Sequence, residues 1–296
     1  MKYCLGTVQF GMNYGIQGNG QPALENVEQM LEYANINGID TLDTAAAYGT
    51  AESVLGNVLK NNTFSNFNIV SKLEPGAFEN TQWSGWKNIA VQKADESRKR
   101  LGVDKLYSYL FHNAGYIFDK DAVDALYGVK EEGITDRIGV SIYTPDEALK
   151  ALEYEVIKAI QIPYNIFDQR LDQCGFFEKA KKQNVLVYAR SSLLQGLVMM
   201  NPDNLPKKVQ FAEGYLREFL NICNSYGFDP LHVAVGYVGY NPNIDYVVFG
   251  VDNLNQLKEY ISIRDWNMPD SIYKDIKSAF ENVEEKLVNP SMWGKE

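Results

Sequence analysis

Cysteine and histidine are both scarce in this sequence. Its 296 residues include only three cysteines, Cys4, Cys174 and Cys223, and two histidines. No CxxC pair and no cluster of cysteine with histidine occurs, so the sequence disfavours a structural zinc site and a disulfide framework. We therefore expect buried free thiols, and no metal site is predicted.

Positive charge is also in short supply. The chain has 28 lysines and arginines against 38 aspartates and glutamates, which gives a formal net charge of −10 at pH 7. A protein with this average charge is repelled by nucleic acid and by anionic membrane surfaces. Neither is expected as a partner, although a local basic pocket for a phosphate is still allowed.

Long apolar segments are missing as well. No run approaches the roughly 18 apolar residues that a membrane span needs. The N-terminal stretch MKYCLGTVQFGMNYG lacks the apolar core of a signal peptide. We expect a cytoplasmic protein.

The composition otherwise suits a folded chain with a substantial core. Hydrophobic residues make up 45% of the sequence and charged residues 22%. No linker, low-complexity stretch or charge run suggests a second domain, so residues 1–296 are expected to form one domain. The sequence does not predict an oligomeric state.

Short β-branched runs alternate with longer amphipathic ones along the whole chain. The predicted strands are 3–10, 39–43, 67–72, 105–112, 136–143, 156–165, 184–192 and 244–251. The predicted helices are 26–38, 51–60, 86–102, 121–133, 145–154, 172–183, 213–227 and 253–261. Eight strand–helix units predict a closed (β/α)8 barrel, a TIM barrel of the α/β class. An open doubly wound sheet is the alternative, but the segment after the first strand, GMNYGIQGNG, lacks the G-x-G-x-x-G spacing of that fold.

Polar residues gather where these strands end, and in such a barrel the active site lies at the carboxyl ends of the strands. The residues at or just after strand ends are Asp43, Tyr48, Lys72, His112, Asn113, Ser141, Gln161, Arg190, Ser191 and Ser192. Singly, each has an ordinary structural explanation: Asp43 could cap a helix, and His112 could be a hydrogen-bonded core histidine. Their joint placement predicts one site.

The chemistry of this set suits proton transfer to a carbonyl oxygen. A free tyrosine has a pKa near 10 and is a poor acid at neutral pH. An ammonium beside it favours the phenolate, so we expect Lys72, held by Asp43, to lower the pKa of Tyr48. His112 can donate a hydrogen bond to the same oxygen. With no nucleophile, metal or second carboxylate, the set favours reversible carbonyl reduction.

The chain resembles the aldo-keto reductases over nearly its full length. DTAAAYGTAESVLG is similar to the family signature, and LGVDKLYSYLFHN to the segment that ends in the catalytic histidine. ITDRIGVS, IQIPYNIFDQ, ARSSLLQGL and VVFGVDNLNQLKE resemble later cofactor-binding segments. The resemblance implies a catalytic tetrad of Asp43, Tyr48, Lys72 and His112 and an NADP or NAD cofactor. The cofactor contacts that it implies are Gly6, Thr7, Asp43, Ser141, Gln161, Ser191, Leu193 and Gly250.

Two departures from the family pattern bear on the cofactor. Arg190 stands where many members have an aromatic residue, and its planar guanidinium is expected to stack on the nicotinamide in the same way. At the last segment Asp252 and Gln256 stand where members that prefer NADP have basic residues, and Lys258 is the only basic side chain there. We expect a weaker preference for NADP than is usual and real use of NAD.

Three functions are compatible with these observations to different degrees. The first is an NAD(P)H-dependent reductase of a small-molecule carbonyl, possible substrates being sugar or nucleotide-sugar ketones. The second is a non-catalytic, cofactor-binding regulatory subunit of the same fold, against which the intact tetrad argues. The third, a barrel hydrolase or isomerase acting on sugars, would need paired carboxylates or a metal at the strand ends, and the sequence shows neither.

Overall fold

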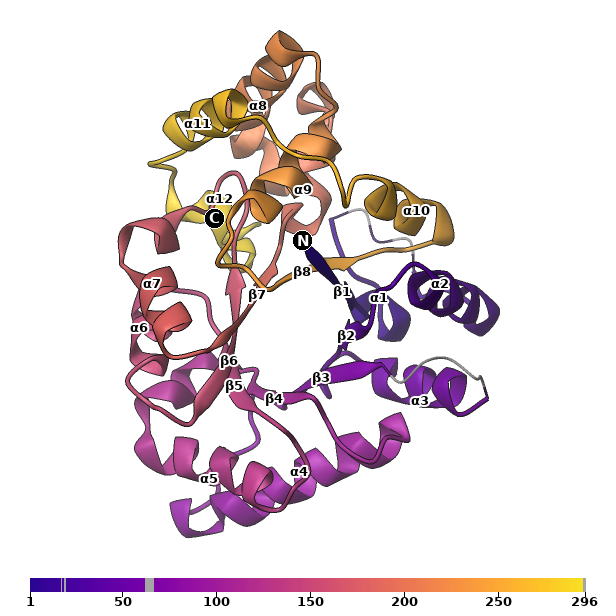
Figure 1. The fold of residues 1–296 in the computed structure, drawn as a ribbon, viewed down its shortest axis with the longest axis vertical. Coiled ribbons are helices and arrows are strands. Elements are labelled where there is room, and N and C mark those ends of the chain that lie inside the picture. Colours follow the sequence, from indigo (N-terminus) through magenta and orange to yellow (C-terminus); the bar gives the residue numbers. More distant parts are fainter. Residues whose placement is uncertain (17, 19, 62–66, 295–296) are drawn as a thin grey trace.

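A closed barrel of parallel strands forms the centre of the molecule, as the sequence predicts. The computed structural model describes residues 1–16, 18, 20–61 and 67–294. Within these residues eight strands pair in the order β1-β2-β3-β4-β5-β6-β7-β8, and β1 closes the ring by pairing in parallel with β8. Figure 1 shows the strands as a central ring with the helices around it. The strands are β1 Lys2–Gly6, β2 Thr41–Asp43, β3 Asn68–Leu73, β4 Ser108–Phe111, β5 Ile138–Ser141, β6 Ile157–Pro163, β7 Leu186–Arg190 and β8 Tyr246–Gly250.

Helices follow the strands in the predicted alternation. Their bounds are α1 Val8–Gly11, α2 Leu24–Ile36, α3 Ala51–Asn61, α4 Trp86–Leu101, α5 Lys120–Glu131, α6 Pro145–Ala151, α7 Phe176–Lys182, α8 Glu213–Tyr226, α9 Pro230–Tyr240, α10 Leu254–Ser262, α11 Asp270–Ala279 and α12 Glu285–Val288. No helix in the described part of the chain has the length and apolar character needed to cross a membrane.

The N-termini of these helices follow from local sequence. Thr144 accepts a hydrogen bond from the backbone N–H of Glu147, and Glu147 accepts from the backbone N–H of Thr144, which is a capping box before Pro145. Asp119 caps α5 and Asp229 caps α9 more simply, each with one carboxylate oxygen that accepts from two backbone N–H groups.

The first predicted strand, 3–10, is too long. β1 ends at Gly6, and Val8–Gly11 forms α1, a single helical turn. The turn buries Phe10 completely in the core. It also brings Gly11 against the loop after β2, so closely that a β-carbon on Gly11 would lie 1.9 Å from the carbonyl oxygen of Tyr48. The chain therefore turns here because it packs against the loop that carries Tyr48.

Apolar side chains pack on both sides of the strands. The larger cluster lies between the strands and the helices. A smaller cluster consists of Cys4, Val70, Leu110, Ala159, Tyr188, Tyr246 and Val248. These residues come from six strands and, because side chains alternate along a strand, they are the residues that fill the barrel interior. Gly139 belongs to the same inward set, and a β-carbon there would lie 1.7 Å from the carbonyl oxygen of Ala159.

The cysteines are free thiols, and Cys4 and Cys223 are buried as expected, whereas Cys174 is only partly buried. No group of three or more metal-ligating side chains occurs in the described residues.

Candidate active site

The predicted site residues form the layer directly above the barrel interior. Along each strand the next inward position lies two residues further on, at the carboxyl end. Counting two residues from the inward-facing residues gives Gly6 after Cys4, Asp43 after Thr41, Lys72 after Val70, His112 after Leu110, Ser141 after Gly139, Gln161 after Ala159, Arg190 after Tyr188 and Gly250 after Val248. The β-alternation therefore places eight of the predicted positions around one mouth.

Lys72 and Asp43 form a buried ion pair at the centre of this layer. The Lys72 Nζ donates to Asp43 Oδ1 at 2.7 Å and to Oδ2 at 2.8 Å. The Lys72 side chain has no exposed surface and that of Asp43 has 5%. Nζ also donates to the carbonyl oxygen of Thr44 at 2.9 Å, so the ammonium is held by three oxygens of β2 and the loop after it.

Tyr48 meets this ion pair from the loop that follows β2. The Lys72 Nζ donates to the Tyr48 hydroxyl at 3.3 Å and lies 4.9 Å from the centre of the ring. Gly49, at a φ of +57°, turns the chain directly after Tyr48, a conformation that glycine adopts without strain. The ring of His112 meets that of Tyr48 edge to face, with centroids 5.6 Å apart and an interplanar angle of 89°. The structure thus brings all four members of the predicted tetrad together.

The predicted lowering of the pKa of Tyr48 is wrong for the protein in this state. Burial raises the pKa of Tyr48 and outweighs the lowering by the charge of Lys72, while Asp43 raises it further. The reason is that burial removes hydration from the charged form of the phenol, and the carboxylate of Asp43 offsets part of the stabilisation that the ammonium of Lys72 gives to a phenolate. Tyr48 therefore holds its proton firmly at neutral pH.

The pKa values of Lys72 and His112 are shifted in opposite directions. Burial lowers the pKa of Lys72, but Asp43 and Tyr48 together outweigh it, so the pKa lies above its usual value and the ammonium stays charged. Burial lowers the pKa of His112 to about 3, assisted by the charges of Lys72 and Arg190. His112 is therefore a neutral imidazole near pH 7, and its Nδ1 is buried without a hydrogen-bond partner in the described chain.

A chain of hydrogen bonds joins β5 and β6 to this ion pair. Ser141 Oγ donates to Gln161 Oε1 at 3.2 Å, and Gln161 Nε2 donates to Asp43 Oδ1 at 2.8 Å. Ser141 and Gln161 are 2% and 1% exposed, so water does not compete for these bonds. Both predicted cofactor contacts thus also orient the carboxylate of Asp43.

Gly6 and Gly250 lie side by side where β1 and β8 end. They are partners in the β1–β8 register, and Gly6 is also the partner of Asp43 on β2. Thr7 donates to the Asp43 carbonyl oxygen through its backbone N–H at 2.9 Å and through Oγ1 at 3.0 Å. The amide of Gln9 lies against Gly250, where a β-carbon would be 2.5 Å from Gln9 Oε1, and this oxygen is buried without a partner in the described residues.

Arg190 is the last residue of β7, and the loop that follows carries Ser191 and Leu193. Arg190 stacks on the ring of Tyr143, with its guanidinium carbon 4.6 Å from the ring centroid. Ser191, Leu194 and Gln195 have φ values of +66°, +45° and +56°, a left-handed course that is uncommon for residues other than glycine. Leu193 is partly buried against the core, and its carbonyl oxygen accepts from the N–H of Gly196 at 2.9 Å.

Asp252 and Gln256 lie apart from the tetrad, at the start of α10. The backbone N–H of Asp252 donates to Gln256 Oε1 at 2.7 Å, and Asn253 caps the helix by accepting from the N–H groups of Asn255 and Gln256. Lys258 lies further along α10 and packs over the ring of Tyr33, with Nζ 5.6 Å from the centroid.

Four residues of the mouth were not predicted from the sequence. Thr44 supplies a carbonyl oxygen to Lys72, and Gln9 lies against Gly250. Tyr143 and Tyr14 are 46% and 39% exposed at the mouth beside Arg190. Tyr143 follows Ser141 by two residues, so the rule of alternation could have found it. Tyr14 is in an irregular loop and gave no such signal.

Comparisons with a family model and with known proteins agree on one family. The model of the aldo/keto reductase family matches residues 2–281. Aldo-keto reductase YhdN from Bacillus subtilis is 24% identical over 309 residues, which cover 97% of this chain and 92% of that protein. Glyoxal reductase from Bacillus subtilis is 29% identical over 199 residues, covering 65% of this chain and 66% of the relative.

Solved structures have the same fold at low sequence identity. A glycerol dehydrogenase from Gluconobacter oxydans superimposes with a TM-score of 0.74 at 21% identity, over 96% of this chain and 94% of that one. A thermostable aldo-keto reductase, Tm1743, has a TM-score of 0.69 at 22% identity, over 93% and 94%.

Proposed function

The chain belongs to the aldo/keto reductase family, a family of oxidoreductases, and from this premise we propose that it reduces an aldehyde or ketone to an alcohol with NADPH or NADH. The observation that carries the proposal is the direct contact of one buried ammonium with both a carboxylate and a phenol: Lys72 Nζ lies 2.7 Å from Asp43 and 3.3 Å from the Tyr48 hydroxyl. A hydride source beside such a proton donor completes a carbonyl reduction.

The residues of the mouth fit a nicotinamide cofactor. The buried, unpartnered Gln9 Oε1 is an acceptor that a ligand with a polar N–H or O–H group would satisfy. The absence of a side chain at Gly250 makes room for the Gln9 amide, which brings this acceptor to the strand ends at Gly6 and Gly250. When bound, the reduced cofactor supplies the hydride. Gly6, Thr7, Ser141, Gln161, Arg190, Ser191, Leu193, Gly250, Asp252 and Gln256 are the proposed contacts.

Tyr48 is the proposed acid in reduction. Its raised pKa keeps the proton on the phenol until the carbonyl oxygen gains negative charge. Lys72 stays charged and then stabilises the phenolate that remains, while Asp43 keeps the ammonium in place. The raised pKa keeps Tyr48 protonated at neutral pH, and the charge of Lys72 partly offsets the effect of burial, so the phenol can still give up this proton.

His112 is proposed to orient the carbonyl. Its imidazole is neutral, since its pKa is lowered to about 3, so one ring nitrogen carries a hydrogen that can be donated to the carbonyl oxygen. A neutral donor does not compete with Tyr48 as the acid. The edge-to-face contact between the two rings fixes their relative orientation.

Replacing Tyr48 by phenylalanine tests the proposal. Steady-state turnover of a panel of aldehydes and ketones, including sugar carbonyls, should fall about 10²- to 10⁴-fold in Tyr48→Phe, because the proton donor is lost. Cofactor binding, followed by the fluorescence of the reduced nicotinamide, should persist. Tyr116→Phe is a matched control, since the hydroxyl of Tyr116 accepts from the N–H of Phe78 and not from Lys72.

Two results would contradict the proposal. Near-normal turnover by Tyr48→Phe would remove Tyr48 as the acid. Cofactor binding by the unmodified protein without turnover of any carbonyl in the panel would favour the non-catalytic regulatory subunit instead.

A further inference from the structure

Arg190 lies at the mouth of the barrel, one inward position beyond Tyr188, which is the register partner of Gln161. In the β6–β7 register Gln161 pairs with Tyr188, and Pro163 pairs with Arg190. Two residues of a strand span about 7 Å. Because Tyr188 belongs to the cluster that fills the barrel, Arg190 shares its inward direction and extends over the site.

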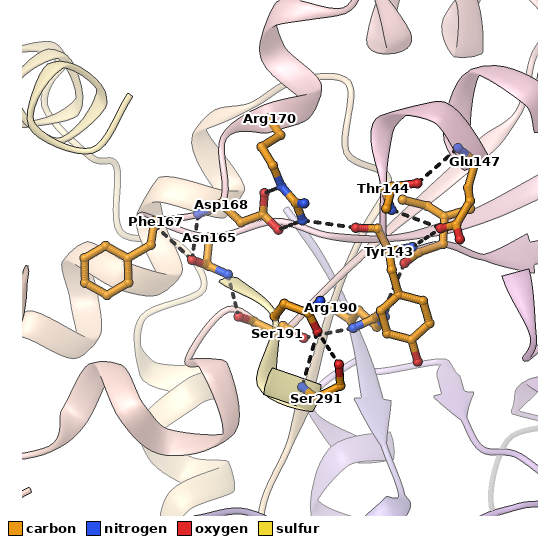
Figure 2. Close-up of polar contacts among 12 residues, drawn as sticks. Tyr143, Thr144, Glu147, Asn165, Phe167, Asp168, Arg170, Arg190, Ser191 and Ser291 are labelled. Carbon is orange, nitrogen blue, oxygen red and sulfur yellow. Dashed lines mark hydrogen bonds and ion pairs between the residues drawn. The ribbon is translucent and has the colours of Figure 1, made fainter. Parts of the chain in front are cut away.

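The guanidinium is held in a fixed position by neighbours from two strand ends. One of its terminal nitrogens donates to the Ile142 carbonyl oxygen at 2.9 Å, and the other to Ser191 Oγ at 3.2 Å. Tyr143 covers one face at 4.6 Å. Figure 2 shows Arg190 beside Tyr143 and Ser191, with Asn165 donating to the Ser191 carbonyl oxygen at 3.1 Å. Two of the five N–H groups of a guanidinium are thus engaged within the described chain.

The charge of Arg190 has no carboxylate partner in the described residues, unlike that of its neighbour Arg170. Arg170 donates to both oxygens of Asp168, each at 2.7 Å, as Figure 2 shows. Glu147, the carboxylate near Tyr143, accepts from the backbone N–H groups of Tyr143 and Thr144. In a chain with a net charge of −10, a fixed cation at the mouth that has no carboxylate partner within the described part of the chain is a specific feature.

This charge also acts on the reacting groups. It contributes to the lowered pKa of His112 and opposes the rise in the pKa of Tyr48. A ligand that contacts His112 and Tyr48 therefore lies within the electrostatic reach of Arg190. The remaining N–H groups of the guanidinium can donate to a carboxylate or phosphate, and stacking of a ring on the guanidinium does not occupy them.

We infer that Arg190 binds an anionic group, a carboxylate or a phosphate, on the carbonyl substrate, so that the enzyme prefers acidic aldehydes or ketones over neutral ones. This inference rests on the proposed function. It adds a substrate class to the reductase and makes Arg190 the residue that determines the specificity.

Matched substrates test the preference. The ratio of kcat/KM is measured for 4-carboxybenzaldehyde against its methyl ester, and for glyceraldehyde 3-phosphate against glyceraldehyde. A hydrogen-bonded charge pair predicts a ratio of roughly 10 to 100 in favour of the anion in at least one pair. The ratio should fall to near one in Arg190→Gln and be partly retained in Arg190→Lys. Circular dichroism and thermal unfolding check that both variants fold.

Arg137→Gln is the control variant. Arg137 also stacks on a tyrosine, with its guanidinium carbon 4.3 Å from the ring centroid of Tyr107, but it lies just before β5, at the opposite end of the barrel. Its replacement should leave the substrate ratio unchanged. A ratio that falls equally in both variants would show a general effect of net charge and overturn the inference.

Binding of succinate against succinamide to the cofactor-saturated protein, measured by calorimetry, separates this inference from the proposed function. If no carbonyl is reduced but succinate binds at least tenfold tighter, and Arg190→Gln abolishes the difference, the anion site stands and the reductase proposal fails. Equal binding of the two compounds overturns the anion site. If Arg190→Gln binds the cofactor more weakly but its substrate ratio is unchanged, Arg190 binds the cofactor and not the substrate. This result also overturns the inference.

Discussion

Replacing Lys72 by methionine should destabilise the protein far more than the loss of one ion pair at its surface. Lys72 and Asp43 attract each other by roughly 6 kcal/mol at their 2.7 Å separation and an effective dielectric constant of 20. Removing one partner from a buried pair typically costs about 3–5 kcal/mol, because the remaining charge is left without compensation. Since the carboxylate of Asp43 would then retain only the N–H of Gln161 among the side-chain partners described above, we expect a loss in this range.

A double-mutant cycle in urea unfolding measures this effect. The free energies of unfolding of Lys72→Met, Asp43→Asn and the double variant are compared with that of the unmodified protein. The double variant contains no buried charge at this point, so it should recover at least about 2 kcal/mol relative to the sum of the two single losses. Lys87→Met is the matched control: its ion pair with Glu131 has the same 2.7 Å distance, but the side chains are 51% and 50% exposed. Its stability should change little.

Additive losses in the cycle would refute this reasoning. They would mean that the effects of the two substitutions on the free energy of unfolding are independent, and that the ion pair does not maintain the site. A loss in Lys72→Met no larger than that in Lys87→Met would refute it equally.

Two further predictions concern pH and cofactor choice. The pKa of His112 is about 3 in the folded protein and about 6.5 in an unfolded chain. Between these two values the unfolded state binds a proton that the folded state does not bind. Lowering the pH should therefore reduce the free energy of unfolding, by about 2 kcal/mol at pH 5. Urea unfolding of the unmodified protein and of His112→Gln at pH 7.5 and pH 5 measures this, and an identical pH dependence in both would contradict it. In titrations with each reduced cofactor, NADPH should bind less than about a hundredfold tighter than NADH. The reason is that Asp252 and Gln256 stand at the start of α10 where members that prefer NADP have basic residues, while Lys258 packs over Tyr33. A larger preference for NADPH would refute the expectation.

The site could be located from the sequence because its residues obey the same alternation as the strands. Val70 and Lys72, or Tyr188 and Arg190, differ by two positions, so that a residue that fills the barrel is followed by one at its mouth. Alternation of this kind is a local property of an extended chain, and it also could have identified Tyr143. It could not have identified Tyr14, which reaches the mouth through an irregular loop, or Gln9, which lies in the short helical turn after β1.

The order of strands and helices, and hence the barrel, was determined by the sequence itself, since periodicity and helix caps such as Thr144 are written in neighbouring residues. The protonation of the site was not. Whether Lys72 lowers the pKa of Tyr48 depends on how much water reaches the phenol and on how closely Asp43 neutralises the ammonium, and both are set by residues far apart in the chain. The partners of Arg190 were decided in the same way, because only the folded barrel brings the ends of β5 and β7 together and leaves that charge without a carboxylate among the described residues. Local sequence fixes which groups are present, but electrostatic energies depend on distance and burial, which exist only after the chain has folded.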